Sequence, residues 1–417
     1  MEVAMKKLHY GWFVCAACTL VLFCTIGFTS TAFSVYIPYI NEFGGLTKTQ
    51  GGVIIMVRCL VALFFIPIVE IYYQRTNIRI GVVLMLITLA GSFVLYSVAQ
   101  SFAGFCIAAA VSGVCYGLGG MIPISILINR WFKSHQGLAI GICSAGSGAT
   151  AIVMPPILTS LIEKISLPFA FLTQAAFVGI VAVITFVVLR NTPAEKGLKP
   201  LEDVHEGIQD TQQPQSGEQI PRKIMYRMYM AILLFGMGGY GTMQNIATLY
   251  ATEGFSGMAI SLLMTLYGIA LLLGKLLYGR STDLFGTYKS GYIFSAILIT
   301  GGALCCFAGF GSAKVAIISM ICLGLGLPLI TVGISICAKD MSCPEEYGKV
   351  IKNFQFFLMA GSALSGPIPG VIADISGSYA PAYALLTTLI FASVILIQYT
   401  YWQTRRNNSK LLTDMDV

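Results

Sequence analysis

Two positively charged side chains, Arg58 and Lys275, lie inside long apolar stretches of this 417-residue chain. A charge at the centre of a bilayer costs at least about 2.5–3.5 kcal/mol, so such a residue usually faces a cavity, a partner or a substrate. Both charges are positive, and a pair of cations attracts a negatively charged solute. We therefore take Arg58 and Lys275 as candidate substrate-binding residues for an anion.

Each cation also has a structural interpretation. Arg58 could form a bridge to Glu70 or to backbone carbonyls, although Glu70 lies about three turns away, too far for a direct i, i+4 pair. Lys275 could extend its long side chain toward the membrane surface. These interpretations stay open beside the functional ones.

Aromatic and amide side chains in the same apolar stretches complete the candidate site. A single aromatic residue in a membrane helix is more often packed or lipid-facing than functional, whereas two adjacent amides in such a helix need hydrogen-bonding partners. The further candidates for contacting the substrate are Phe33, Tyr36, Tyr116, Tyr240, Gln244, Asn245, Asn353 and Gln355.

Residues suited to catalysis or metal binding are scarce in the apolar stretches. The three histidines, His9, His135 and His205, all fall in predicted loops. Cys15 and Cys18 have a spacing found in metal sites, but they lie within the first apolar stretch, where cysteine behaves as a small packing residue. We find no nucleophile–base pair and no metal cluster. The sequence predicts neither enzymatic activity nor a cofactor.

The composition is that of a membrane protein. Only 10% of the residues are charged and 56% are hydrophobic, whereas a soluble domain has about 25% charged residues. Stretches long enough to cross a bilayer, about 17–25 residues each, recur along the chain. We predict an all-α protein with twelve transmembrane helices at 10–38, 49–73, 79–99, 102–131, 136–162, 167–190, 224–252, 257–281, 289–310, 313–337, 350–375 and 380–403.

A long polar segment, 191–222, separates the first six predicted helices from the last six. With the N-terminus inside, twenty of the 25 lysines and arginines fall in inside segments, three in outside segments and two within helices. This bias predicts that both termini are cytoplasmic. The expected organisation is a six-helix bundle at 1–190, a cytoplasmic linker at 191–222, a second six-helix bundle at 223–404 and a cytoplasmic tail at 405–417. Two such halves are typical of transporters.

The loop predicted between the eighth and ninth helices, residues 279–289, reads G-R-S-T-D-L-F-G-T-Y-K. It resembles the G-x-x-x-D-x-x-G-x-R/K loop of the major facilitator superfamily. An acid at a helix end can pair with cations and helix dipoles across a moving interface. The resemblance implies the fold of that superfamily and a role in conformational gating for Gly279, Arg280, Asp283 and Gly286.

A narrower resemblance lies between the fourth and fifth predicted helices. Residues 129–132 (N-R-W-F), 136–141 (Q-G-L-A-I-G) and 145–148 (A-G-S-G) are similar to the monocarboxylate porter group, which includes the oxalate:formate exchangers. Arg130 within this segment joins the gating candidates. The resemblance implies transport of a small organic anion.

The chain departs from this group at individual positions. Relatives usually have Arg seven or eight residues before the loop Asp, and here Lys275 lies eight residues before Asp283. Leu358 stands where the oxalate exchangers have a second cation, so the resemblance implies no second clamp for a dicarboxylate. Leu271 stands where the proton-coupled relatives have Asp, which argues against proton coupling by that route. Arg58 is outside the group's pattern and could supply the second cation from the opposite bundle.

These observations predict a secondary active transporter that moves a small organic anion, such as a monocarboxylate, across the cell membrane by alternating access. The alternatives are a multidrug or other-solute efflux transporter of the same fold, and a solute sensor that does not transport. Efflux of cationic drugs favours acids in the cavity, whereas this chain places cations there. We expect a monomer in membrane lipid, with a coupled proton or counter-anion as optional partners and no nucleic acid. The substrate, the direction of flux and the coupling stay open.

Overall fold

The computed structural model describes residues 9–202, 222–342 and 346–415. Most of the predicted linker lies outside these residues. The described residues fold into helices and contain no β-strand, only an isolated bridge between Phe132 and Leu201. The all-α prediction is confirmed for this part of the chain.

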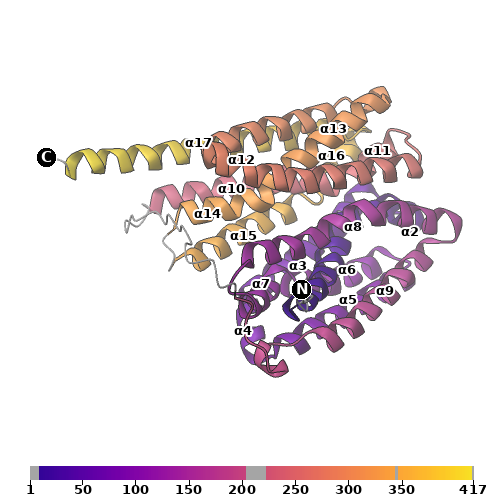
Figure 1. The fold of residues 1–417 in the computed structure, drawn as a ribbon. Helices are drawn as coiled ribbons and strands as arrows, with labels where there is room; N and C mark the ends of the chain where they lie inside the picture. The colour runs from indigo at the N-terminus through magenta and orange to yellow at the C-terminus, as the bar shows by residue number, and fades with distance from the viewer. Residues whose placement is uncertain (1–8, 203–221, 343–345, 416–417) are drawn as a thin grey trace, which may run out of the picture.

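Helices α1 to α9 form one group, drawn in indigo to magenta in Figure 1. The first segments run α1 (Gly11–Leu22), a π-helix η1 (Phe23–Thr31), α2 (Phe33–Gly44), α3 (Lys48–Phe65), a 3-10 turn η2 (Ile66–Ile68) and α4 (Val69–Arg75). The group continues with α5 (Ile78–Val98), α6 (Phe102–Leu118), α7 (Met121–Trp131), α8 (Gln136–Lys164), α9 (Leu167–Val188) and a 3-10 turn η3 (Pro193–Lys196).

Helices α10 to α17 form the second group, drawn in salmon to yellow (Figure 1). They are α10 (Arg222–Gln244), α11 (Ile246–Thr252), α12 (Gly257–Cys305), a 3-10 turn η4 (Ala308–Phe310), α13 (Ala313–Gly326), a π-helix η5 (Leu329–Gly333), α14 (Ile334–Asp340), α15 (Tyr347–Leu364), α16 (Ile368–Ser376) and α17 (Ala380–Met415). The long α12 contains two helices joined at Gly286, whose φ of 77° interrupts the helical backbone.

Hydroxyl caps begin several of these helices. The side chains of Ser101, Ser166 and Ser256 each accept a hydrogen bond from the backbone N–H three residues later. Thr47 and Gln50 form a reciprocal capping box at the start of α3. Such caps satisfy N–H groups that the first turn of a helix leaves unpaired, so they fix where each helix begins.

Ten helical segments among the described residues are long and apolar enough to cross a membrane. Helix α10, which begins with Arg222 and Lys223, and the part of α12 after Gly286 are long helices outside these ten. The number of twelve transmembrane helices and the cytoplasmic termini therefore stay predictions.

Several predicted transmembrane helices are interrupted rather than continuous. The fourth breaks between α6 and α7 at Gly119 and Gly120, and the seventh breaks between α10 and α11 at Asn245. In η1, the hydroxyls of Thr25 and Thr31 donate to carbonyls four residues earlier. Such bonds compete with the regular backbone ladder and disturb α-helical geometry. The interruptions place irregular backbone in the interior of the bundle.

The two groups meet at the end of the molecule remote from the C-terminus (Figure 1), where α3 packs on α15 and α16, α2 on α11, and α8 on α12. Glycines permit the close approach: a Cβ at Gly52 would lie 2.3 Å from the carbonyl oxygen of Gly366, and one at Gly268 would lie 2.7 Å from the carbonyl carbon of Ala151. Toward the opposite end, a Cβ at Gly141 of α8 or Gly279 of α12 would meet no atom within 4 Å. Helices α8 and α12 therefore diverge toward the end that carries the C-terminus.

Candidate functional site

Arg58 lies in α3 with only 2% of its surface exposed. Its guanidinium carbon is 4.9 Å from the centre of the Phe33 ring and 5.9 Å from the centre of the Tyr116 ring. Its Nε and Nη1 atoms are buried, and no described residue accepts a hydrogen bond from either. The structure thus places two predicted site residues, Phe33 and Tyr116, around a third, Arg58, whose Nε and Nη1 lack acceptors among the described residues.

Close packing of α6 against α3 positions these groups. A Cβ at Gly113 would lie 2.5 Å from the carbonyl oxygen of Arg58, and one at Gly117 would lie 2.7 Å from the carbonyl oxygen of Ala62. Only glycine tolerates this approach of two helix backbones. Tyr116, on the turn between these glycines, consequently reaches the guanidinium.

The two aromatic rings do not offset the burial of Arg58. Burying an ion costs several kcal/mol even after the protein relaxes, whereas a desolvated cation–π contact returns about 2 kcal/mol. A structural bridge to carbonyls is absent at Nε and Nη1 among the described residues, and the side chain of Glu70 lies outside them. A carboxylate would offer two acceptors in the planar geometry that a guanidinium matches.

Lys275 lies on the face of α12 that contacts α8. Thr265 on this face donates to the carbonyl of Ile152 at 3.1 Å, and a Cβ at Gly148 of α8 would lie 3.7 Å from a methyl of Leu272. Lys275 follows in the same row one turn later, where the two helices begin to diverge. The side chain is half-buried, and the structure shows no hydrogen bond or ion pair for it among the described residues.

Gln244 connects the two helical groups next to Arg58. Its Nε2 donates to Ser362 Oγ at 2.9 Å and lies 3.8 Å from Cys59 Sγ, and Cys59 Sγ lies 3.6 Å from Ser362 Oγ. The Oε1 atom of Gln244 is buried and no described residue donates to it. The sequence indicated Gln244 but not Cys59 or Ser362, because small side chains in a membrane helix are usually packing residues.

Tyr240 is the other predicted residue near this interface. Its hydroxyl has Tyr116 and Cys59 of the first helical group and Tyr267 of α12 among its electrostatic neighbours. The side chain is half-buried. It therefore stands with Gln244 on the α10 side of the site.

Four predicted residues are engaged elsewhere or exposed. Tyr36 is buried within the first helical group, where it donates to Gln174 Oε1 at 3.0 Å. Asn245 donates to the carbonyl of Gly241 at 3.1 Å and so satisfies the end of α10. Two more predicted residues lie on α15: Asn353 donates to the Tyr229 hydroxyl at 3.1 Å, and Gln355 is exposed. These contacts account for the Tyr36 hydroxyl and for the amide nitrogens of Asn245 and Asn353 without a ligand.

The predicted gating residues lie around the break in α12 and on α7. Gly286 forms the break itself, and Gly279 lies one turn before Asp283 with open space around it. Arg280 and Arg130 have no ion pair among the described residues. The side chain of Asp283 lies outside the described part. The expected network of charges therefore stays a prediction.

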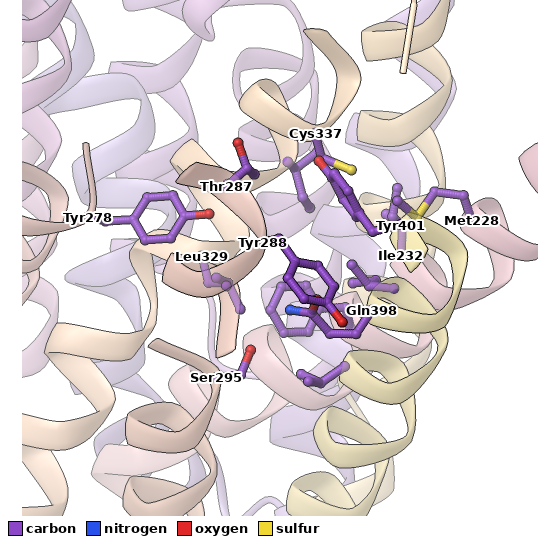
Figure 2. A pocket seen from close by; sticks show the side chains of 16 residues that line it. Met228, Ile232, Tyr278, Thr287, Tyr288, Ser295, Leu329, Cys337, Gln398 and Tyr401 are labelled. Carbon is purple, nitrogen blue, oxygen red and sulfur yellow. The ribbon is translucent and has the colours of Figure 1, made fainter. Parts of the chain in front are cut away.

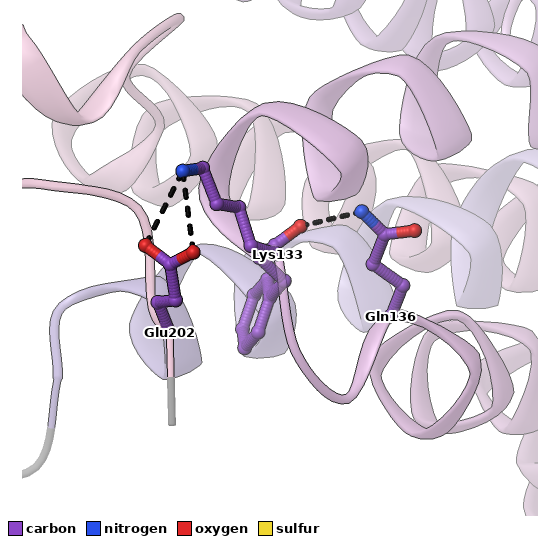
Figure 3. A network of polar contacts seen from close by, with 4 residues as sticks. Lys133, Gln136 and Glu202 are labelled. Atoms are coloured by element: carbon purple, nitrogen blue, oxygen red, sulfur yellow. Dashed lines mark hydrogen bonds and ion pairs between the residues drawn. The ribbon is translucent and has the colours of Figure 1, made fainter. Parts of the chain in front are cut away.

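One ion pair is present among the described residues. Lys133 Nζ lies 3.2 Å from Glu202 Oε2 (Figure 3), and both side chains are exposed. Beside it, Gln136 donates to the carbonyl of Phe132 at 2.7 Å. An exposed pair contributes only about 0–1 kcal/mol, but together with the backbone bridge at Leu201 it attaches the segment after α9 to the α7–α8 loop.

A carboxylate closes the end remote from the C-terminus. Asp374 of α16 accepts hydrogen bonds from the backbone N–H of Thr49 at 2.9 Å, from the Thr49 hydroxyl at 2.5 Å and from the N–H of Lys48 at 3.3 Å. The Lys48 ammonium also lies 5.5 Å from the centre of the Tyr379 ring. Asp374 thus caps α3 from the opposite helical group, which the sequence did not indicate because the two segments are more than 300 residues apart.

A cavity of about 40 Å³ lies in the second helical group, between α10, α12, α14 and α17. Figure 2 shows Tyr278, Tyr288, Gln398 and Tyr401 around it. Arg58 and Lys275 do not line this cavity, so it is separate from the site described above. The described residues contain no cluster of histidine, cysteine or carboxylate groups suited to a metal.

Comparison with known proteins identifies the family. The Major Facilitator Superfamily profile matches residues 19–258 and 228–414. The chain belongs to the Major Facilitator Superfamily. It is therefore a multi-pass membrane transporter and not an enzyme, as the sequence predicts.

Individual relatives refine the comparison. Monocarboxylate transporter 12 of Mus musculus is 24% identical over 432 residues, which cover 93% of this chain and 85% of that protein. The probable transporter MCH2 of Saccharomyces cerevisiae is 24% identical over 311 residues, which cover 72% of this chain and only 61% of that protein. The crystal structure of the nucleoside transporter NupG matches with a TM-score of 0.75 at 12% identity, over 94% of this chain and 100% of that one. This structural likeness shows the fold alone.

Proposed function

We propose that this protein transports a small organic anion, a monocarboxylate, across the cell membrane by alternating access. The observation that carries the proposal is the pair of buried Arg58 nitrogens without acceptors. A carboxylate bound there would accept a hydrogen bond from one of these nitrogens and neutralise the buried charge. Lys275, on the opposite helical group and without an ion pair among the described residues, supplies the second positive charge.

The bilobal arrangement supports alternating access. In the proposal, residues 1–190 and 223–404 are two bundles joined by a cytoplasmic linker, so the end closed by Asp374 faces outward and the diverging end of α8 and α12 faces the cytoplasm. The structure then corresponds to an inward-facing state. In the proposal, Arg58 in one bundle and Lys275 in the other hold one anion between the two halves. Gln244 already reaches across this interface to Cys59.

Two positions favour a single carboxylate and argue against proton symport by the relatives' route. Leu358 is buried, and its backbone packs so closely on α10 that a Cβ at Gly236 would lie 2.3 Å from its carbonyl oxygen. No second clamp for a dicarboxylate exists there. Leu271 is also buried and cannot carry a proton. The similarity to proteins named monocarboxylate transporters agrees with this substrate class, and we propose exchange or uniport.

Uptake into proteoliposomes tests this function. The purified chain is reconstituted and offered radiolabelled formate, acetate, lactate, oxalate and a lipophilic cation, each with and without a pH gradient. We expect saturable uptake of at least one monocarboxylate, little uptake of oxalate, and none of the cation. Uptake of the cation alone would support the efflux alternative, and saturable binding of a carboxylate without flux would support the sensor alternative.

A further inference from the structure

A groove of about 450 Å³ lies on the outer surface between the second part of α12 and α17. Five of its eleven lining residues are large, exposed aromatic or aliphatic side chains, namely Tyr292, Phe391, Ile395, Tyr399 and Trp402. Because α17 contains a segment long and apolar enough to cross a membrane, Ala380–Gln403, we take this surface to face lipid. The volume falls within the range of about 300–1,000 Å³ that is typical of small-molecule sites.

A buried amide stands at the inner wall of the groove. Gln398 lines both the groove and the cavity of Figure 2, and only 6% of its surface is exposed. No described residue donates a hydrogen bond to its Oε1 atom. Leaving a buried acceptor unpaired costs about 1–3 kcal/mol. A ligand in the groove that carries a hydroxyl would remove this cost.

Glycine at position 291 makes room for this amide. A Cβ there would lie 2.8 Å from Gln398 Nε2. Any larger residue would displace the amide from the wall between the groove and the cavity. The absence of a side chain at position 291 thus leaves the space that the buried Gln398 amide occupies.

We propose that this groove binds a sterol from the surrounding membrane, with the ring system against the aromatic side chains and the hydroxyl donating to Gln398 Oε1. A sterol is a flat apolar body with one hydroxyl at its end, whereas a phosphatidylcholine has no donor for the amide. Gln398 lies five residues before the end of the candidate span at Gln403, which is about 7.5 Å at helical rise. That depth places the sterol hydroxyl near the headgroups.

The local sequence agrees with a sterol. Val394, Tyr399 and Arg405 fit the loose pattern L/V-x₁₋₅-Y-x₁₋₅-K/R that has been proposed for sterol contact. Val394 and Tyr399 both line the groove. The pattern is common by chance, so the geometry around Gln398 carries the proposal.

Photo-crosslinking of the full chain in phosphatidylcholine nanodiscs tests the proposal. The probe is a photoreactive cholesterol, and labelled peptides are located by mass spectrometry. We expect saturable labelling at 288–299 and 391–402. Excess cholesterol should abolish this labelling, and its 3α-hydroxyl epimer should compete at least several-fold less well. Gln398→Leu should lower the labelling at least fivefold. Labelling spread evenly over all lipid-facing helices, or unchanged in Gln398→Leu, would overturn the proposal.

A matched pair of variants distinguishes loss of the binding site from loss of folded protein. Ile395→Ala removes an exposed aliphatic side chain from the groove, and Leu385→Ala removes another exposed aliphatic side chain of α17 that lies outside it. We expect Ile395→Ala to reduce labelling and Leu385→Ala to leave it unchanged, with both variants eluting as folded protein. Equal labelling of the two variants, or competition by diacylglycerol as strong as that by cholesterol, would contradict a sterol site.

Discussion

At the scale of single residues, the unpartnered nitrogens of Arg58 have a consequence for stability. Replacing a buried ion pair by apolar side chains is often neutral or stabilises a protein by about 1–4 kcal/mol, and Arg58 has no acidic partner among the described residues. We therefore predict that Arg58→Leu raises the apparent melting temperature of the ligand-free protein in detergent while abolishing transport. Arg75→Leu, at an exposed arginine, should change the melting temperature little. A lower melting temperature in Arg58→Leu would mean that the guanidinium has a stabilising partner.

Lys275 gives a second prediction at this scale. If its charge attracts the substrate, Lys275→Gln should abolish uptake at unchanged expression, and Lys275→Arg should retain part of it because the positive charge stays. Uptake per folded molecule in proteoliposomes measures both. A loss of folded protein that equals the loss of uptake would indicate a structural role.

Residue types alone could predict the two cations, because a charge inside an apolar stretch is conspicuous. They could not predict which polar side chains are already satisfied. Tyr36 and Asn245 look like Gln244 in the sequence, yet they bond to Gln174 and to a backbone carbonyl, whereas Gln244 reaches across the interface. Local hydrogen bonds decide this, and they depend on neighbours far away in the chain.

At the scale of elements, the contact of α16 with the start of α3 controls one end of the transporter. Asp374 accepts from two backbone N–H groups of α3, and a carboxylate at a helix N-terminus contributes about 0.5–2 kcal/mol. We predict that Asp374→Asn increases the population in which this end is open. Double electron–electron resonance between spin labels at positions 164 and 376 should then show an additional population with a longer distance between the labels.

Glu42→Gln is the control for this variant, because Glu42 is an exposed acid at the same end and makes no hydrogen bond to the other helical group among the described residues. It should leave the distance distribution unchanged. An unchanged distribution in Asp374→Asn would show that glycine-mediated packing of α3 on α16 closes this end without the carboxylate.

The helical segments could be predicted from hydropathy to within a few residues, because each is a long apolar run. Their interruptions could not. The break at Asn245 and the π-helix η1 arise from side-chain bonds to the backbone, such as that of Thr25. These bonds leave no mark in the apolar pattern, and they lie where the two helical groups face each other.

At the scale of the whole molecule, the absence of an acid at position 271 and in the first helix bears on coupling. We predict that an imposed inward proton gradient changes the initial rate and the final level of carboxylate uptake only weakly. A preloaded counter-anion should accelerate uptake if the protein is an exchanger. Strong accumulation driven by the proton gradient alone would contradict exchange and uniport.

The bilobal fold could be predicted from the two sets of helices around a polar segment, and the family comparison confirms the fold. The conformational state could not be predicted. Inward-facing and outward-facing forms share every helix and differ only in which inter-bundle contacts are made. The free-energy difference between them therefore depends on a few contacts, such as those of Gly52, Gly268 and Asp374.

The most direct test is a double-mutant cycle on carboxylate affinity, measured by calorimetry for the original protein, Arg58→Gln, Lys275→Gln and the double variant. One anion held by both cations predicts that each single change weakens binding about tenfold, or roughly 1.4 kcal/mol, and that the double variant loses less than the two single losses summed. Strictly additive losses, or unchanged affinity in Arg58→Gln, would contradict a shared anion site and leave Lys275 as the sole anchor.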